Sequence, residues 1–435
     1  MTKRIASILL IIAFMLELGM MTFLSGSFGL HISPLIFFTV SLLIGIGGIM
    51  LAFKNKENEA NELQDTPFLK KVLLPTWLIA GIITTSISLM KIFSNFKIDV
   101  KYSDIIPQVS VLVKRFLNHE FPYQVISEWG YNLFPTYLPL QWLPFTIPEV
   151  LHFDYRWIAF AVLCSAIIFY GLYFLRKNIS TPGLVILLSL PFISLLLIAK
   201  YDPSVFAVTI ENLIAGYYLI LCLTIFTRSN LLRGLGLVLC LLSRYSLIFW
   251  VPLYLTIIFF SESKKNALII AVFCVMGVIL IYGLPFLTKN PAIFLKGYNY
   301  HTYAAVSEWT GQSWQAPGDK PVALFKGFGF ASYFYDYLNG GLIKKLRILQ
   351  IVHFVGSIVV IVILGILFFK FKNNIDYKIY ALGSLKIYLV FFYNFIQIPY
   401  SYLFIVPVFV SLPILGMAML NLSIFLHCED IAVEF

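Results

Sequence analysis

The sequence predicts an all-α, polytopic integral membrane protein, and three observations support this fold class. Of the 435 residues, 60% are hydrophobic and 12% are charged, whereas soluble domains are about 45–50% apolar and about 25% charged. Long apolar runs recur along the whole chain, which favours about 11–13 helical membrane segments. These runs lack the strict alternation of barrel strands. The composition therefore excludes both a soluble enzyme and a disordered chain.

Nine runs approach or exceed the roughly 20 apolar residues that cross a bilayer as a helix. They are residues 5–24, 32–53, 72–93, 157–175, 181–199, 203–226, 266–287, 348–370 and 401–420. No sequence repeat and no separate soluble unit lies between them. We therefore expect one transmembrane domain over residues 1–435.

Three other stretches are apolar but interrupted. Residues 134–151 contain four prolines, which argues against a straight helix. Residues 231–260 are broken around Arg244, and each half is short for a full crossing, so we expect a short helical hairpin that returns to the same side. Residues 379–396 carry Lys386 and Asn394 and form a marginal span.

Basic residues at the ends of the runs predict the orientation, because cytoplasmic loops are enriched in Lys and Arg. These basic residues indicate a single orientation if 134–151 does not cross the membrane and 231–260 is a hairpin. A full crossing by 134–151 would invert the predicted orientation of all later segments. Two long loops, 94–133 and 288–346, then face outward. The net charge of +10 indicates basic cytoplasmic loops and contact with anionic lipid rather than with nucleic acid.

The first outer loop contains a predicted amphipathic helix with an acidic residue at its start. Ser103 suits the N-cap position, and Asp104 then lies in the first turn. The helix dipole favours an ionised Asp104, which would be placed at the membrane boundary to accept a proton from a sugar hydroxyl. Its apolar stripe is expected to rest on the membrane surface, with Gln108, Lys114 and Arg115 off it. That stripe comprises Ile105, Val109, Leu112 and Phe116.

Other interpretations of this loop stay open. Asp104 has the alternative role of a simple helix cap, and Asp99, Glu120 and Glu128 are rival carboxylates. The aromatic residues Tyr123 and Trp129 suit the faces of a sugar, and they equally suit an aromatic belt at the membrane interface.

Arg244 lies at the break of the predicted hairpin. A charge at membrane depth is costly and is a functional hypothesis by default. An arginine fits a phosphate with two parallel hydrogen bonds, as at a lipid carrier. The alternative pairs Arg244 with a buried carboxylate, either Glu211 or Glu17.

Further polar candidates lie elsewhere in the chain. Glu211 and Asn212 fall inside an apolar run, and His301 lies in the second outer loop. No residue spacing indicates a metal site, and the nucleophile-elbow, P-loop and dinucleotide motifs are missing from the sequence. A lipid-linked sugar donor is therefore favoured over a nucleotide-linked one.

The order of these features resembles the GT-C superfamily of membrane glycosyltransferases, especially bacterial mannosyltransferase- and arabinofuranosyltransferase-like proteins. The resemblance covers roughly residues 72–420 and begins with Asp104 before a juxtamembrane helix. The sequence departs from the family at 210–211, where Ile-Glu replaces Gly-Gln, and in two extra N-terminal helices. The other matching stretches are 118–123 (NHEFPY), 134–139 (FPTYLP), 210–212 (IEN), 234–244 (GLGLVLCLLSR) and 399–402 (PYSY).

This resemblance implies inverting transfer of a sugar from a polyprenyl-phosphate donor to a glycan or lipid acceptor on the outer face of the cytoplasmic membrane. It implies that Asp104 is the general base and that Arg244 contacts the lipid phosphate, and it leaves a divalent cation open. The remaining expected substrate-binding residues are Glu211, Asn212, Tyr123, Trp129, His301 and Tyr400. The alternatives are an O-antigen or capsule polymerase, and a lipid-linked oligosaccharide flippase or another transporter.

Overall fold

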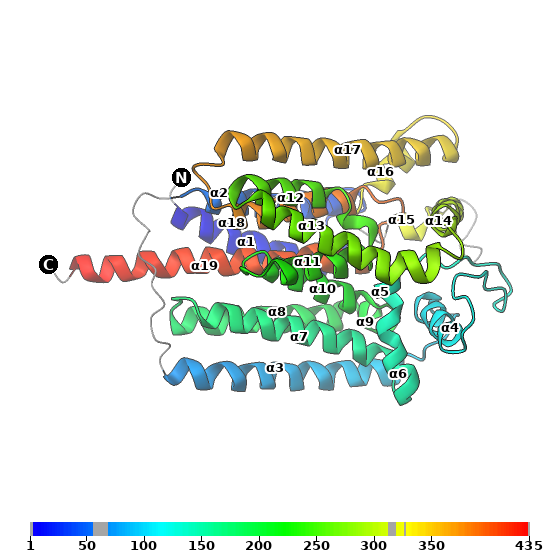
Figure 1. The fold of residues 1–435 in the computed structure, drawn as a ribbon, viewed down its shortest axis with the longest axis horizontal. Coiled ribbons are helices and arrows are strands. Elements are labelled where there is room, and N and C mark those ends of the chain that lie inside the picture. The colour runs from blue at the N-terminus through cyan, green and yellow to red at the C-terminus, as the bar shows by residue number, and fades with distance from the viewer. Residues whose placement is uncertain (1–2, 55–67, 312–318, 326–327, 434–435) are drawn as a thin grey trace.

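In the computed structural model the chain folds into a bundle of long helices with short helices at one end (Figure 1). The structure describes residues 3–54, 68–311, 319–325 and 328–433, and within these the regular elements are all helical. The long helices run side by side along the longest axis of the molecule (Figure 1). They are α1 (Lys3–Met21), α2 (Ile32–Ala52), α3 (Phe68–Asn95), α7 (Tyr155–Leu175), α8 (Thr181–Tyr201), α10 (Glu211–Thr224), α13 (Lys264–Val278) with its π-helical continuation η3 (Ile279–Leu287), α17 (Leu342–Phe371), α18 (Tyr377–Asn394) and α19 (Ile405–Val433).

Short helices gather at one end of this bundle, which we call the loop end (Figure 1). Both predicted outer loops lie there. The opposite end, where α1 begins and α19 ends, is called the terminal end. The helices of the loop end are α4 (Ile105–Leu117), α5 (Pro139–Trp142), η1 (Leu143–Phe145), α6 (Thr146–Leu151), α9 (Ser204–Ala207), α14 (Ile293–Thr310), α15 (Val322–Phe325), α16 (Ala331–Tyr337) and η4 (Ser401–Phe404).

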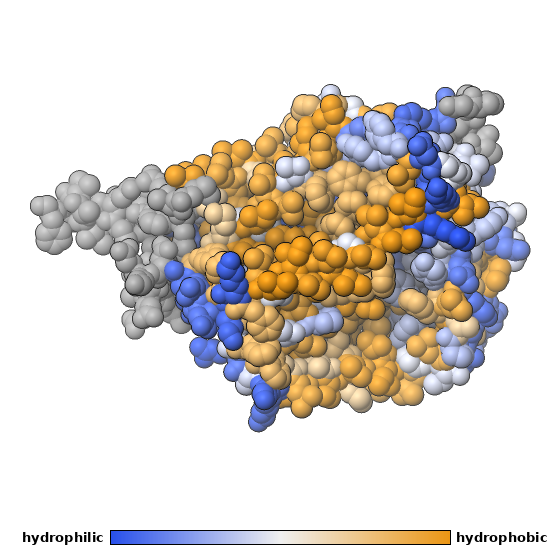
Figure 2. All heavy atoms as spheres, turned by 90° about the horizontal axis from the view of Figure 1, so that it is seen from above, coloured by the Kyte–Doolittle hydropathy of each residue, from blue (hydrophilic) through white to orange (hydrophobic). Residues whose placement is uncertain are grey.

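The molecule is a multi-pass membrane protein. Seven helical segments of the described chain are long and apolar enough to cross a bilayer, and four shorter apolar helices accompany them. Figure 2 shows a broad apolar belt with hydrophilic residues towards both ends of the bundle, as a membrane-embedded protein requires. The seven segments are Ile32–Ala52, Pro75–Asn95, Tyr155–Leu175, Thr181–Tyr201, Lys264–Leu287, Leu342–Phe371 and Ser401–Leu422.

Two of the three interrupted stretches are divided into short helices. Residues 134–151 do not form one span, because their prolines divide them into α5, η1 and α6 at the loop end. Residues 231–260 form a hairpin of α11 (Asn230–Leu241), the short η2 (Tyr245–Leu247) and α12 (Trp250–Ser261), with Arg244 at its tip. Its backbone is tied to α5 by a 2.9 Å hydrogen bond from Leu140 N to Leu242 O.

The prediction of one continuous span over 203–226 is wrong. The segment breaks between α9 and α10, and α10 begins at Glu211. The hydroxyl of Thr209 accepts a 3.3 Å hydrogen bond from Glu211 N, which satisfies an amide that the new helix start leaves free. Glu211 and Asn212 therefore lie in the first turn of a helix, not in the middle of one.

Lys386 of α18 and Glu17 of α1 form an ion pair in which both side chains are fully buried. Lys386 also donates to Pro407 O at 2.8 Å, and Ser411 donates to Glu17 at 2.7 Å. Ser41 of α2 donates to the same carboxylate. The pair thus links α1, α2, α18 and α19. The alternative partner for Arg244, Glu17, is already occupied.

Candidate functional site

Asp104 is the residue from which the candidate site is built. It occupies the N-cap position of α4, but its side chain makes no capping hydrogen bond. Ser103, predicted as the N-cap, lies one residue earlier, and its hydroxyl accepts a 3.3 Å hydrogen bond from Ile105 N. The Asp104 carboxylate instead accepts a hydrogen bond from the Tyr131 hydroxyl at 3.4 Å. A simple capping role therefore does not describe Asp104.

The environment of Asp104 strengthens it as a base. Burial raises the pKa of its carboxyl group above the ordinary value, and hydrogen bonds from its own backbone amide and from Tyr131 only partly oppose this. The pKa of the Tyr131 hydroxyl rises to about 12, through burial and then through the negative charge of Asp104. A carboxylate with a raised pKa holds an abstracted proton more firmly, which suits a general base.

The rival carboxylates have a different environment. Asp99, Glu120 and Glu128 are exposed, whereas Asp104 is half-buried. Asp99 also closes a local turn by accepting a 2.9 Å hydrogen bond from Lys101 N. Among these four, Asp104 alone combines partial burial with a tyrosine partner.

The buried face of α4 differs from the predicted stripe. Gln108 is buried rather than directed to water, and Phe116 is 38% exposed. The reason is that α4 packs against α5, η1 and α6 and does not lie alone on a membrane surface. Phe116 still contacts this layer through an edge-on contact with Trp142, at 5.6 Å between ring centroids.

Arg244 forms an ion pair with Glu211, which bears out the structural alternative for its partner. The Glu211 side chain is 2% exposed and that of Arg244 is 18% exposed. The pair leaves Arg244 Nε and Glu211 Oε2 buried without a hydrogen-bond partner in the protein, as is Asn212 Oδ1 in the next residue. Guanidinium has five N–H donors, so pairing with Glu211 leaves capacity for a second anionic oxygen.

Tyrosines connect Asp104 to the Arg244–Glu211 pair. Burial raises the pKa of Tyr137 well above its ordinary value; the negative charge of Asp104 raises it further, and the positive charge of Arg244 lowers it. Both charges therefore lie close enough to act on one phenol. The structure brings the two principal candidates of the sequence analysis into a single cluster.

Residues from the second loop and from η4 complete this cluster. Tyr400 stacks on Tyr402 with ring centroids 5.2 Å apart. The pKa of Tyr400 is raised by burial and then by Tyr402, Glu308 and Asp104. The pKa of His301 is lowered by burial and by Arg244, which keeps this imidazole neutral. The charge of Arg244 therefore acts on His301, and the charges of Glu308 and Asp104 act on Tyr400.

Tyr123 and Trp129 have supporting positions. The Tyr123 side chain is 3% exposed; its hydroxyl donates to Tyr137 O at 2.9 Å and accepts from Trp142 Nε1 at 3.1 Å. It holds the backbone of Tyr137 and offers little surface for a substrate. Trp129 is half-buried and lies beside Tyr131, with ring centroids 6.2 Å apart.

Four residues of the cluster are not among the predicted site residues: Tyr131, Tyr137, Tyr402 and Glu308. Tyr137 lies in the proline-rich stretch 134–139, which is one of the stretches that resemble the GT-C superfamily. Glu308 has only the general signal of a carboxylate in a long loop. Among the described residues no group of three or more His, Cys, Asp or Glu side chains is placed to hold a metal ion.

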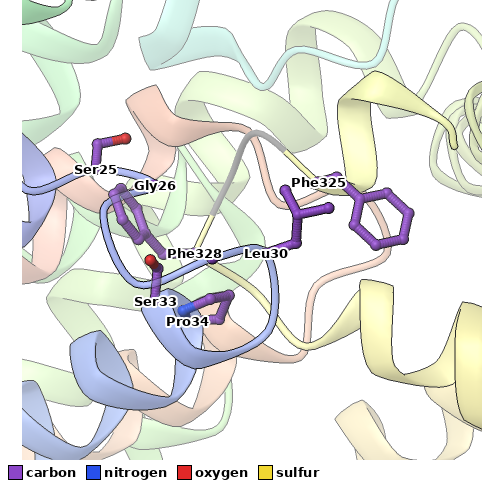
Figure 3. Close-up of a pocket in the computed structure, with 8 residues that line it drawn as sticks. Ser25, Gly26, Leu30, Ser33, Pro34, Phe325 and Phe328 are labelled. Atoms are coloured by element: carbon purple, nitrogen blue, oxygen red, sulfur yellow. The ribbon is translucent and has the colours of Figure 1, made fainter.

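Two cavities open near the loop end. One lies between Phe249 beside the hairpin tip, Tyr298 of α14, His353 of α17 and Phe392 of α18. The other lies between the start of α2 and the side chains of Phe325 and Phe328 (Figure 3). Its lining residues carry no charge; they are Ser25, Gly26, Gly29, Leu30, Ser33, Pro34, Phe325 and Phe328. The charged groups of the loop end thus favour the cluster around Asp104 and Arg244 as the candidate site.

Comparisons with known proteins find no matching family model, no matching curated protein and no matching solved structure.

Proposed function

We propose that this protein is a membrane glycosyltransferase that takes a sugar from a polyprenyl-phosphate donor and transfers it to a glycan or lipid acceptor on the outer face of the cytoplasmic membrane. The observation that carries the proposal is that the half-buried, non-capping Asp104 and the cation Arg244 both act on Tyr137, in one tyrosine-lined cluster. A base and a phosphate-binding cation are the two groups that this transfer requires. The GT-C-like arrangement and a helix count of about 11–13 belong to the same proposal.

The proposed reaction is a single displacement. The acceptor hydroxyl gives its proton to the Asp104 carboxylate, and its oxygen forms a bond to the anomeric carbon. The bond between that carbon and the phosphate oxygen breaks, and its electron pair leaves with the lipid phosphate. The unpartnered Arg244 N–H is available to stabilise the charge that develops there. One displacement inverts the configuration of the sugar.

The position of Arg244 suits a donor that arrives from the bilayer. The cavity lined by Phe249 and Tyr298 lies beside the hairpin tip, and α14 contributes Tyr298 to this cavity and His301 to the cluster. Tyr298 and Phe354, two lining residues, are 52% and 57% exposed. Exposed aromatic rings in a membrane protein are suited to contact an isoprenoid chain.

Glycan analysis of a deletion strain tests this function. We expect mass spectrometry of its surface glycans to show the loss of one sugar, restored by the wild-type chain and by Asp99→Asn but not by Asp104→Asn. A shortened polymer of intact repeat units would instead indicate a polymerase. Unchanged glycans would contradict glycosyl transfer and favour a transporter.

The pH dependence of transfer provides a separate test of Asp104. A base must be deprotonated, so activity falls as the pH falls through its pKa. Because burial raises this pKa, the acidic limb of kcat/KM should lie above pH about 4, the ordinary value for Asp. Tyr131→Phe removes a hydrogen bond that lowers the pKa, so it should move the limb to still higher pH. If the acidic limb of kcat/KM does not move in Tyr131→Phe, a group other than Asp104 titrates there.

Substitution of Arg244 by lysine should weaken donor binding. Lys keeps the charge opposite Glu211 but lacks the planar fork that binds two phosphate oxygens. We expect the donor KM to rise about tenfold, since hydrogen bonds to charged groups contribute about 1.5–3 kcal/mol. Arg228→Lys, an exposed position between α10 and α11, is the matched control. Equal donor KM values in the Arg244→Lys and Arg228→Lys variants would show that Arg244 does not bind the donor.

A further inference from the structure

The terminal end carries a compact surface of lysines and phenylalanines that the proposed reaction does not use. Two chain segments form it: the turn from α12 into α13 and the last turns of α17. The Phe260 and Phe369 rings lie 4.9 Å apart, and Lys372 Nζ lies 5.5 Å from the Phe260 ring centroid. The lysine–phenylalanine patch comprises Lys264, Lys265, Lys370, Lys372, Phe259, Phe260 and Phe369.

Among the residues that the structure describes, no acidic side chain neutralises the cations of this patch. All four lysines are exposed, and none forms an ion pair with a carboxylate among the described residues. The nearby carboxylate of Glu262 is bound by Arg233 at 2.7 Å and by the Tyr377 hydroxyl at 2.6 Å. Asp376 caps α18 through Lys378 N at 2.8 Å. The patch therefore presents four positive charges at one edge.

The surface that continues from the patch along the bundle is apolar. Phe260 is 51% exposed and Phe369 is 46% exposed. Towards the centre of the belt, Leu268 of α13 and Ile366 of α17 are 64% and 61% exposed. A partner for this region needs an anionic group at the patch and long apolar chains beside the two helices.

We propose that the lysine–phenylalanine patch binds the headgroup of an anionic phospholipid, with the acyl chains lying along α13 and α17. The phosphodiester faces the four lysines, and the phenylalanine rings lie at the level where headgroup meets hydrocarbon. Anionic lipids are enriched in the cytoplasmic leaflet. Binding there places the terminal end on the cytoplasmic side and the loop end, with Asp104, on the other.

Lipid binding to the purified full-length chain tests this proposal. The probes are phosphatidylglycerol and phosphatidylcholine of equal chain length, titrated in detergent and counted by native mass spectrometry. The patch variant combines Lys264→Gln, Lys265→Gln, Lys370→Gln and Lys372→Gln. The control variant makes the same change of charge at exposed lysines elsewhere, with Lys97→Gln, Lys101→Gln, Lys289→Gln and Lys296→Gln.

We expect wild type and the control variant to bind phosphatidylglycerol at least about tenfold more tightly than the patch variant does, because each lysine near an anionic surface contributes to binding. Equal binding by the patch and control variants would overturn the proposal. Wild-type chain gives a second measurement that needs no substitution: preference for phosphatidylglycerol over phosphatidylcholine should fall in about 0.5 M salt. No headgroup preference at low salt would also overturn it.

Discussion

Asp104→Asn should reduce the rate of sugar transfer by about 10²–10⁴-fold, the usual contribution of a positioned general base. Asparagine keeps the size of the side chain and can still accept a hydrogen bond from Tyr131, but it cannot take a proton from the acceptor hydroxyl. The rate should fall in kcat, with little change in the donor KM, because Arg244 and not Asp104 holds the donor phosphate in the proposed mechanism. Purified protein in liposomes containing the lipid-linked donor provides the measurement.

Asp99→Asn is the matched control for this experiment. It removes a carboxylate five residues earlier in the same loop, but Asp99 is exposed and forms only a local turn. We expect transfer rates within about twofold of wild type, since surface substitutions away from special features have small effects. If both variants lose activity equally, the loop conformation rather than proton transfer accounts for the loss. If Asp104→Asn keeps its rate, Asp104 is not the base.

Glu308 is another carboxylate beside the stacked Tyr400 and Tyr402, and its effect should differ from that of Asp104. It acts on Tyr400 by charge and by a side-chain hydrogen bond. The structure therefore favours a positioning role for Glu308, through the tyrosine. The pH profile separates the two carboxylates, because the acidic limb belongs to Asp104 alone in this mechanism.

The membrane architecture could be predicted because its causes are local in sequence. Apolar runs of sufficient length define spans, and prolines divide residues 134–151 into short helices. Arg244 lies at a hairpin tip because the apolar pattern breaks there. The break at 208–210 was missed because its residues are apolar or weakly polar and carry no proline.

The site could be predicted only in part, because its convergence is a tertiary effect. Asp104, Tyr137, Arg244 and Tyr400 come from segments far apart in the chain, and no periodicity relates them. Gln108 likewise has a burial that depends on tertiary packing and not on the pattern of its own helix. Its helix was expected to present this side to water, but α5, η1 and α6 cover it.

Lys386→Met should strongly lower the stability of the folded protein. It leaves the Glu17 carboxylate fully buried with only the hydroxyls of Ser41 and Ser411 as partners. Removing one member of a buried ion pair costs about 3–5 kcal/mol, because the remaining charge stays desolvated and unpaired. Thermal unfolding in detergent should therefore show a large fall in midpoint, and Lys97→Met, at an exposed lysine, should show little.

The double variant Glu17→Met with Lys386→Met distinguishes a structural pair from a proton pathway. Replacing both charges by apolar side chains of similar volume removes the desolvation cost together with the attraction, so stability should return to near the wild-type value. If the pair only links α1, α2, α18 and α19, sugar transfer should return as well. A double variant that is stable but inactive would mean that Glu17 and Lys386 exchange protons during function, as buried charges do in transporters, and it would count against the glycosyltransferase proposal.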